Sequence, residues 1–125
     1  MIKTDQTIFD LGKGNCFAAC VASILEIPIT EVRHFTDGES LHWREEINEW
    51  LAERGLFFID VSLNGDIRDE LVRFWGYHLI LGESPRRGDI RHAVVGYKGE
   101  IVHDPHPSRA GLAGEDWNYG LLVAV

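Results

Sequence analysis

The stretch that decides the fold is residues 12–28, which read GKGNCFAACVASILEIP. Its first four residues are small or polar, and the alanine-rich run that follows carries bulky apolar side chains at 17, 20, 21, 24 and 25. Apolar residues at this spacing predict a buried helix over 16–25. Pro28 prevents that helix from continuing. Cys16 then occupies the first turn, where backbone N–H groups have no partner within the helix.

Outward from this segment, helical patterns give way to strand-like ones. Ser40 is a candidate cap for a helix over 41–54, and Asp66 is a candidate cap for a helix over 67–74. Strands are expected over 56–61, 77–81, 92–97, 100–104 and 119–125, with a loop over 105–118. Helices followed mainly by antiparallel strands predict an α+β fold, in which the first helix packs on an antiparallel sheet.

The composition is that of a folded chain, and 125 residues suit one domain over 1–125. The net charge is −8, and Lys and Arg form no basic stripe, so nucleic acid and membrane surfaces are not expected partners. No apolar run approaches the roughly 20 residues that span a bilayer. Residues 1–15 lack the apolar core of a secretory signal. We therefore expect a cytoplasmic protein whose thiols stay reduced.

Cys16 is the candidate nucleophile. The thiolate is the reactive form of cysteine, and both a helix N-terminus and a neighbouring imidazolium favour it. The predicted helix supplies the first of these, and the backbone N–H of Cys16 can stabilise the oxyanion of an acyl-transfer intermediate. Cys20 lies one turn further along and is expected in the core. A disulfide between the two would have to form along a single helical turn, where its geometry is poor.

A predicted hairpin supplies the neighbouring imidazole. His92 begins a strand, Lys98-Gly99 forms a tight turn, and the returning strand ends at Asp104. A turn centred on Lys98-Gly99 brings a residue near 105 opposite His92, one position from Asp104. A carboxylate there accepts the second imidazole N–H, fixes the tautomer and stabilises the cation. The predicted catalytic residues are therefore Cys16, His92 and Asp104.

Three segments, NCFAAC at 15–20, HAVVGY at 92–97 and VHDP at 102–105, together resemble the papain-like cysteine peptidases. The type they resemble is the small bacterial one that includes the leader-peptidase domains of bacteriocin exporters. The resemblance covers residues 6–107 and implies a papain-like fold. It also implies a glutamine before the cysteine that completes the oxyanion hole. Gln6 is the only glutamine in the chain, and Asn15, through its side chain or backbone N–H, is the alternative.

The expected function is a cysteine hydrolase that cleaves an amide, in a peptide or isopeptide bond, through a thioester. Its substrate would be a peptide or protein, and it would need no cofactor. An acyltransferase would use the same triad with a different second acceptor. A non-catalytic interaction or regulatory module on a papain-like fold stays open, because the chain is short for an enzyme with a full substrate groove.

Zinc is a further alternative. Two thiols and two imidazoles, from Cys16, Cys20, His103 and His106, make a legitimate zinc set, but zinc would leave His92 and Asp104 without a role. In the triad interpretation, His106 either lines the cleft or lies in a loop without a role in the site.

Overall fold

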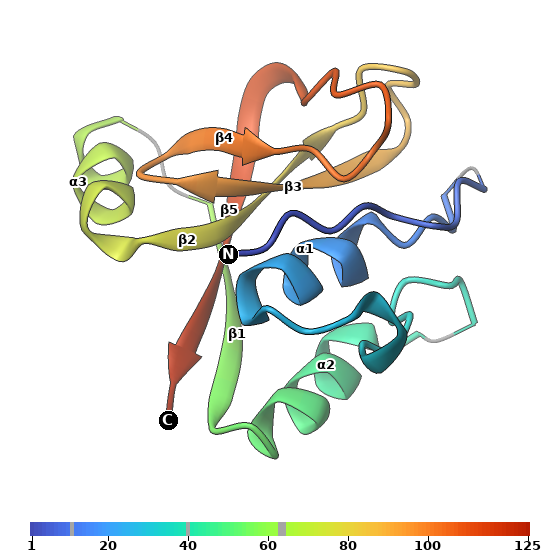
Figure 1. The fold of residues 1–125 in the computed structure, drawn as a ribbon. Helices are drawn as coiled ribbons and strands as arrows, with labels where there is room; N and C mark the ends of the chain where they lie inside the picture. Colours follow the sequence, from blue (N-terminus) through green and yellow to red (C-terminus); the bar gives the residue numbers. More distant parts are fainter. Residues whose placement is uncertain (11, 40, 63–64) are drawn as a thin grey trace.

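The computed structural model describes residues 1–10, 12–39, 41–62 and 65–125. Its strands form one antiparallel sheet in the order β1-β5-β2-β3-β4, and α1 and α2 lie next to each other beside it (Figure 1). The strands are β1 (Leu56–Val61), β2 (Tyr77–Glu83), β3 (Arg91–Tyr97), β4 (Glu100–His103) and β5 (Ala113–Ala124). The helices are α1 (Cys16–Leu25), α2 (Trp43–Ala52) and α3 (Gly65–Trp75), with a short 3₁₀ turn at Ile29–Glu31. The α+β class is confirmed.

Helix α1 has the predicted bounds, and its sequence explains its position. Every residue from Phe17 to Ser23 is buried, so the helix runs through the interior, where it packs on β3 and β2. Its alanines bring the helix backbone close to the sheet. The helix ends where Glu26 adopts a left-handed conformation, with φ of 58°, a common way to end a helix.

The two faces of the sheet bury separate apolar clusters. The larger cluster joins α1, α2 and one sheet face, and its buried members are Phe17, Ala18, Cys20, Val21, Ala22, Val32, Phe35, Ile47, Leu51, Phe58, Leu79, Ala93 and Val95. The smaller one lies on the other face, where Val72 of α3 packs against Ile80, Val94 and Tyr119. Alternate residues along β2 and β3 thus serve opposite faces, as expected for strands.

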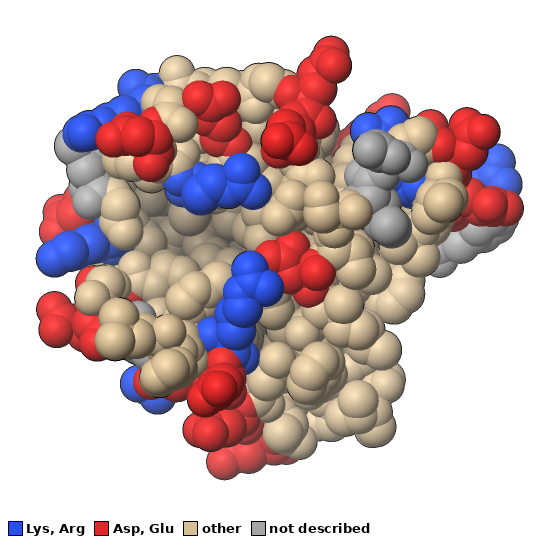
Figure 2. Space-filling view, turned by 180° about the vertical axis from the view of Figure 1, so that it is seen from behind, with Lys and Arg blue, Asp and Glu red and all other residues tan. Residues whose placement is uncertain are grey.

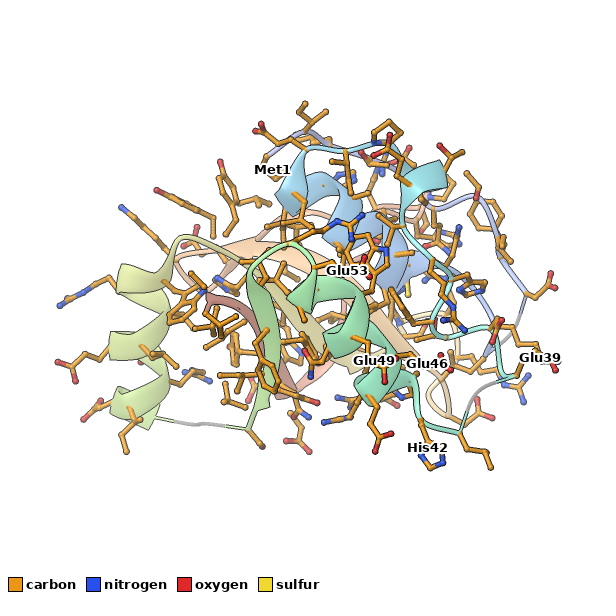
Figure 3. The ribbon with its side chains drawn as sticks, turned by 90° about the horizontal axis from the view of Figure 1, so that it is seen from below. Met1, Glu39, His42, Glu46, Glu49 and Glu53 are labelled. Atoms are coloured by element: carbon orange, nitrogen blue, oxygen red, sulfur yellow. The ribbon has the colours of Figure 1, made fainter. Side chains whose placement is uncertain are left out.

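Helix α2 covers β1. Ile47 and Leu51 are buried, while Glu49 and Glu53 lie along its exposed side (Figure 3). Asn48 fixes the contact, because its Oδ1 accepts the backbone N–H of Phe58 at 2.7 Å. None of the helices among the described residues has the length and apolar character needed to cross a lipid bilayer.

The predicted helix boundaries were wrong at two places. Helix α2 begins at Trp43 rather than 41, and the proposed cap Ser40 lies outside the described residues. Helix α3 begins at Gly65, two residues earlier than predicted, so Asp66 lies inside the first turn rather than at the cap. A carboxylate in that turn is still favourable, because it faces the positive end of the helix dipole.

The loop predicted over 105–118 is also too long. Strand β5 begins at Ala113, which pairs with Glu83, and a register shift follows before Asn118 pairs with Leu81. The polar residues Glu115 and Asp116 are exposed, which is why this part of the strand lacks an apolar signal. Strand β5 therefore lies between β1 and β2 and holds the two halves of the sheet together.

Candidate functional site

Cys16 is the first residue of α1, as predicted, and its side chain is half-buried. Cys20, one turn further along, is fully buried, and both thiols are free. Burial, together with the nearby Cys16 and Asp104, raises the pKa of the Cys20 thiol well above its ordinary value. Cys20 is therefore a protonated core residue, and Cys16 is the accessible cysteine of the pair.

Asn15 holds the segment before α1 in place. Its Oδ1 accepts the backbone N–H groups of Thr7 and Ile8 at 2.9 and 2.8 Å, and its Nδ2 donates to Thr7 Oγ1 at 2.9 Å. Its backbone N–H donates to the Ile8 carbonyl. Asn15 is thus occupied in holding residues 7 and 8 against the start of α1. Asn15 is also not among the residues that line the cavity beside Cys16, whereas Gln6 is, and this argues against the alternative that Asn15 supplies the oxyanion donor.

The role of Asn15 gives a stability prediction. Asn15→Ala leaves two N–H groups of the segment without their acceptor, so we expect unfolding free energy to fall by about 1–3 kcal/mol. Asn15→Asp keeps the acceptor oxygens and should retain most of the stability. Urea unfolding followed by circular dichroism measures both variants. Equal losses of stability in the two variants would contradict this role for the Oδ1 atom of Asn15.

His92 and Asp104 are brought together as predicted. His92 is the second residue of β3, and its Nε2 lies 2.7 Å from Asp104 Oδ1, with both side chains 4% exposed. Asp104 follows the end of β4. Its carboxylate also accepts the N–H of His106 on Oδ1 at 2.9 Å and that of Gly111 on Oδ2 at 2.7 Å. Because Asp104 occupies Nε2, Nδ1 is the ring nitrogen left for Cys16.

The hairpin register behind this pair differs from the prediction. Tyr97 pairs with Glu100 as expected, but the register shifts beyond Gly96, and Val95 pairs with His103. An extra residue in β4 causes this shift, which is a β-bulge. Continuous pairing would instead have placed Val102 opposite Val95. Asp104, which forms the hydrogen bond with His92, therefore follows a strand that contains a bulge.

The electrostatics of the pair favour two charged groups. Burial lowers the pKa of His92, but its interactions with Asp104 and Cys16 outweigh burial and raise the pKa to about 9. Burial raises the pKa of Asp104, but hydrogen bonds from His92, His106 and Gly111 outweigh it and lower the pKa below its ordinary value. At neutral pH, His92 is an imidazolium held by a carboxylate, next to the thiol.

The segment before the helix places Gln6. This segment runs along α1 (Figure 1), where Ile2 N–H donates to the Ser23 carbonyl. The backbone N–H of Gln6 donates to the Pro105 carbonyl at 3.1 Å, next to Asp104. Gln6 is 7% exposed, and its Nε2 donates to the Ile8 carbonyl at 3.0 Å. The amide nitrogen therefore keeps a second N–H for another acceptor.

A glycine allows this packing. A Cβ added to Gly14 would lie 3.0 Å from the Ile8 carbonyl oxygen and 3.3 Å from Gln6 Nε2. Two backbone hydrogen bonds lie between Gln6 and Cys16: Lys13 N–H donates to the Asp10 carbonyl, and Asn15 N–H donates to the Ile8 carbonyl.

Cys16, His92 and Gln6 line one cavity of about 830 Å³. Aromatic and apolar side chains form part of its wall, among them Phe9, Phe17, Trp43, Leu81 and Ile90. The face seen in Figure 2 is hollowed, with basic side chains on opposite sides of the hollow. The basic residues lining the cavity are Arg44, Arg86, Arg87 and Arg91.

His106 also lines the cavity. Its ring lies 6.3 Å from that of His92 and 5.6 Å from that of Phe9, edge-on to both. The backbone N–H of Ser108 donates to His106 Nδ1 at 3.0 Å, so the proton of the neutral ring is on Nε2. Burial and the charge of Arg86 lower the pKa of His106. This second imidazole is therefore neutral at pH 7.

The zinc alternative does not fit the described residues. His103 donates from Nε2 to the Thr4 carbonyl at 2.9 Å, and Cys20 lies in the core. Within residues 1–10, 12–39, 41–62 and 65–125, no three His, Cys, Asp or Glu side chains are placed to hold a metal ion together.

The cavity wall contains residues that the sequence did not single out. Arg86 and Arg87 come from the loop before β3, and Arg91 is the first residue of β3, next to His92. That short separation along the chain was the available signal. Arg44 and Asp60 come from α2 and β1 and form an ion pair at 2.6 Å. Their place beside Cys16 depends on how α2 packs on the sheet, so no local pattern could indicate it.

The comparisons with known proteins give no family. No protein-family model, curated protein or solved structure matches this chain. The function proposed for it therefore rests on the geometry and chemistry of this cavity.

Proposed function

We propose that this chain is a cysteine hydrolase that cleaves an amide bond in a peptide or protein through a thioester intermediate. Cys16 is the nucleophile, His92 the general acid and base, and Asp104 the residue that orients His92. The observation that carries the proposal is the buried His92–Asp104 pair in the same cavity as a cysteine at a helix N-terminus. A papain-like arrangement is part of the proposal, supported by the order of the nucleophile helix and the hairpin.

The first half of the reaction forms the thioester. The Cys16 thiolate attacks the amide carbonyl carbon and forms a C–S bond, while the carbonyl electrons move onto oxygen. His92, protonated at neutral pH because its pKa is about 9, gives its Nδ1 proton to the leaving nitrogen. The C–N bond breaks, the amine departs, and the thioester remains with neutral His92 beside it.

The second half restores the enzyme. His92 takes a proton from water as the water oxygen attacks the thioester carbonyl, and the C–S bond then breaks. The products are the carboxylic acid, the Cys16 thiolate and the His92 imidazolium. Asp104 stays ionised throughout and stabilises the cation. An amine or alcohol in place of water would make the same residues an acyltransferase.

Two donors are suited to the oxyanion. The backbone N–H of Cys16 lies in the first helical turn, where it has no intrahelical partner, and it moves with the nucleophile. Gln6 contributes the Nε2–H that its bond to the Ile8 carbonyl leaves free. Donors held in place before the reaction stabilise the developing charge without rearrangement. We therefore assign the oxyanion hole to Cys16 N–H and Gln6, and not to Asn15.

Selective alkylation tests the proposal directly. In the folded protein near pH 6.5, iodoacetamide should modify Cys16 faster than Cys20 by about a hundredfold or more, because the thiolate is the reactive form and Cys20 is buried and protonated. Peptide mapping by mass spectrometry gives both rates, and unfolding in urea provides the control, since both cysteines should then react alike. Slow, equal modification of both in the folded protein would instead favour the non-catalytic module.

A further inference from the structure

Two arginines in the cavity wall have no acidic partner. Arg86 donates to Ser108 Oγ at 3.0 Å, and Arg91 donates to the Leu81 carbonyl at 3.3 Å. Among the described residues, neither guanidinium lies within 4.0 Å of a carboxylate oxygen. Each of these bonds uses one of the five N–H donors that a guanidinium offers. Both side chains are held by neutral acceptors and still have donors free.

The other charged residues of the cavity do not neutralise these two arginines. Arg87 is bound to Asp89 through two hydrogen bonds of 2.6 and 3.0 Å, and Arg44 is paired with Asp60. Asp10 is the remaining acidic residue in the lining. The lining therefore carries a net charge of +1 before His92 is counted, from four Arg and three Asp, although the whole chain carries −8.

Glu83 and His106, which neighbour the two arginines, are consistent with a net positive charge in the cavity lining. Glu83 lies opposite Arg91 in the strand register, but its Oε1 lies close to the position that a Cβ on Gly88 would take, so the carboxylate turns toward the loop. On the other side, the charge of Arg86 is a cause of the lowered pKa of His106, after burial. The positive charge of Arg86 therefore acts inside the cavity, one imidazole away from His92.

We propose that Arg86 and Arg91 bind a carboxylate of the substrate beside Cys16, so that the substrate is an acidic peptide. A guanidinium with free N–H groups in a fork matches a carboxylate in shape and charge. The carboxylate is either an Asp or Glu side chain near the cleaved bond or the terminal carboxylate of the peptide. The inference deepens the proposed hydrolase, because it rests on Cys16 as the reacting group.

A pair of alkylating agents tests this without a known substrate. Iodoacetate carries a carboxylate, and iodoacetamide is its neutral counterpart of almost equal size. The ratio of their rates at Cys16 should fall about threefold to tenfold in Arg86→Gln and Arg91→Gln, and the wild-type ratio should fall as salt is added. Arg54→Gln is the matched control, because Arg54 lies over Trp50 on α2 and should leave the ratio unchanged. His92 attracts iodoacetate in every variant, so its effect cancels.

The outcomes separate this inference from the proposed function. If iodoacetamide does not react with Cys16, the hydrolase proposal fails. If it reacts but the ratio is the same in wild type, Arg86→Gln and Arg91→Gln, the carboxylate site alone is overturned.

Protection of Cys16 from iodoacetamide distinguishes the two sources of carboxylate. Acetyl-Gly-Glu-Gly-amide offers only a side-chain carboxylate, acetyl-Gly-Gly-Gly offers only a terminal one, and acetyl-Gly-Gln-Gly-amide offers neither. Protection by one of the first two, lost in Arg91→Gln, identifies the source. Protection by neither overturns the assignment to an acidic peptide.

Discussion

Cys16→Ala should remove amide hydrolysis, lowering kcat by about 10⁵- to 10⁶-fold, the size of loss expected when a catalytic triad loses its nucleophile. No thioester can form without the thiol, and the remaining donors only bind and polarise the substrate. His92→Gln should lose nearly as much, because the leaving amine then departs without a proton. The two losses should not add in the double variant, since the residues act as a unit.

The kinetic measurement needs a substrate, which is identified with the wild-type protein. A library of peptides is incubated with the wild type, cleaved peptides are identified by mass spectrometry, and the best one is used for kinetics. Cys20→Ala is the matched control, because it removes a thiol from the same helix but from the core. It should lower stability by about 1–2 kcal/mol and leave kcat within a few-fold of wild type.

Cleavage that persists in Cys16→Ala would overturn the assignment of the nucleophile. No cleavage by the wild type, together with unreactive Cys16, would favour the interaction module instead. No cleavage with a reactive Cys16 would point to an acyltransferase, which can be examined by adding hydroxylamine or amines as acceptors. Each result therefore favours a different member of the set of functions open to this cavity.

The parts of the site that sequence could predict are those built from short segments. The apolar spacing over 16–25 indicates a buried helix, and the small, polar residues before it place Cys16 at its start. The Lys98-Gly99 turn brings His92 and Asp104 near each other because a tight turn fixes which strand residues meet. Both inferences depend on a few neighbouring residues, and the structure has α1 and the His92–Asp104 hydrogen bond where they were expected.

The parts that sequence could not predict depend on distant packing. The bulge in β4 shifts the register by one residue, and no turn signal marks it. Strand β5 begins in exposed polar residues, where it pairs with β2, and its pairing with β1 starts only at Tyr119. The roles of Asn15 and Asp60 follow from contacts with residues 7–8 and with α2. These contacts form only once the helices pack on the sheet.

Asp104→Asn should lower the pKa of His92 from its value of about 9. In the wild type, burial lowers this pKa and the interactions with Asp104 and Cys16 outweigh it. The substitution removes the carboxylate and leaves the burial and the interaction with Cys16. Both carboxylate oxygens accept N–H groups, and an asparagine offers one acceptor in their place. The imidazole therefore holds its proton less tightly and loses its fixed tautomer, and activity should fall, but by less than the roughly 10⁴-fold found for serine triads.

The same substitution should change how stability depends on pH. The folded pKa of His92, about 9, lies above its ordinary value of 6.5, so its contribution is fully present below pH 6.5. That contribution is lost as pH rises toward 9. A difference of this size corresponds to roughly 3 kcal/mol of unfolding free energy in the wild type. Asp104→Asn should show a smaller decline, because the carboxylate that raises the pKa of His92 is gone.

NMR titration of the His92 ring measures the pKa, and urea unfolding at pH 6, 7.5 and 9 measures the stability. Asp5→Asn is the control, because Asp5 is also an acid paired with a basic side chain, Arg109, but it does not contact His92. It should leave the His92 pKa near 9. An unchanged His92 titration in folded Asp104→Asn would make Asp104 only a turn residue. A lowered pKa with unchanged hydrolysis would show that His92 does its work without being held as a cation.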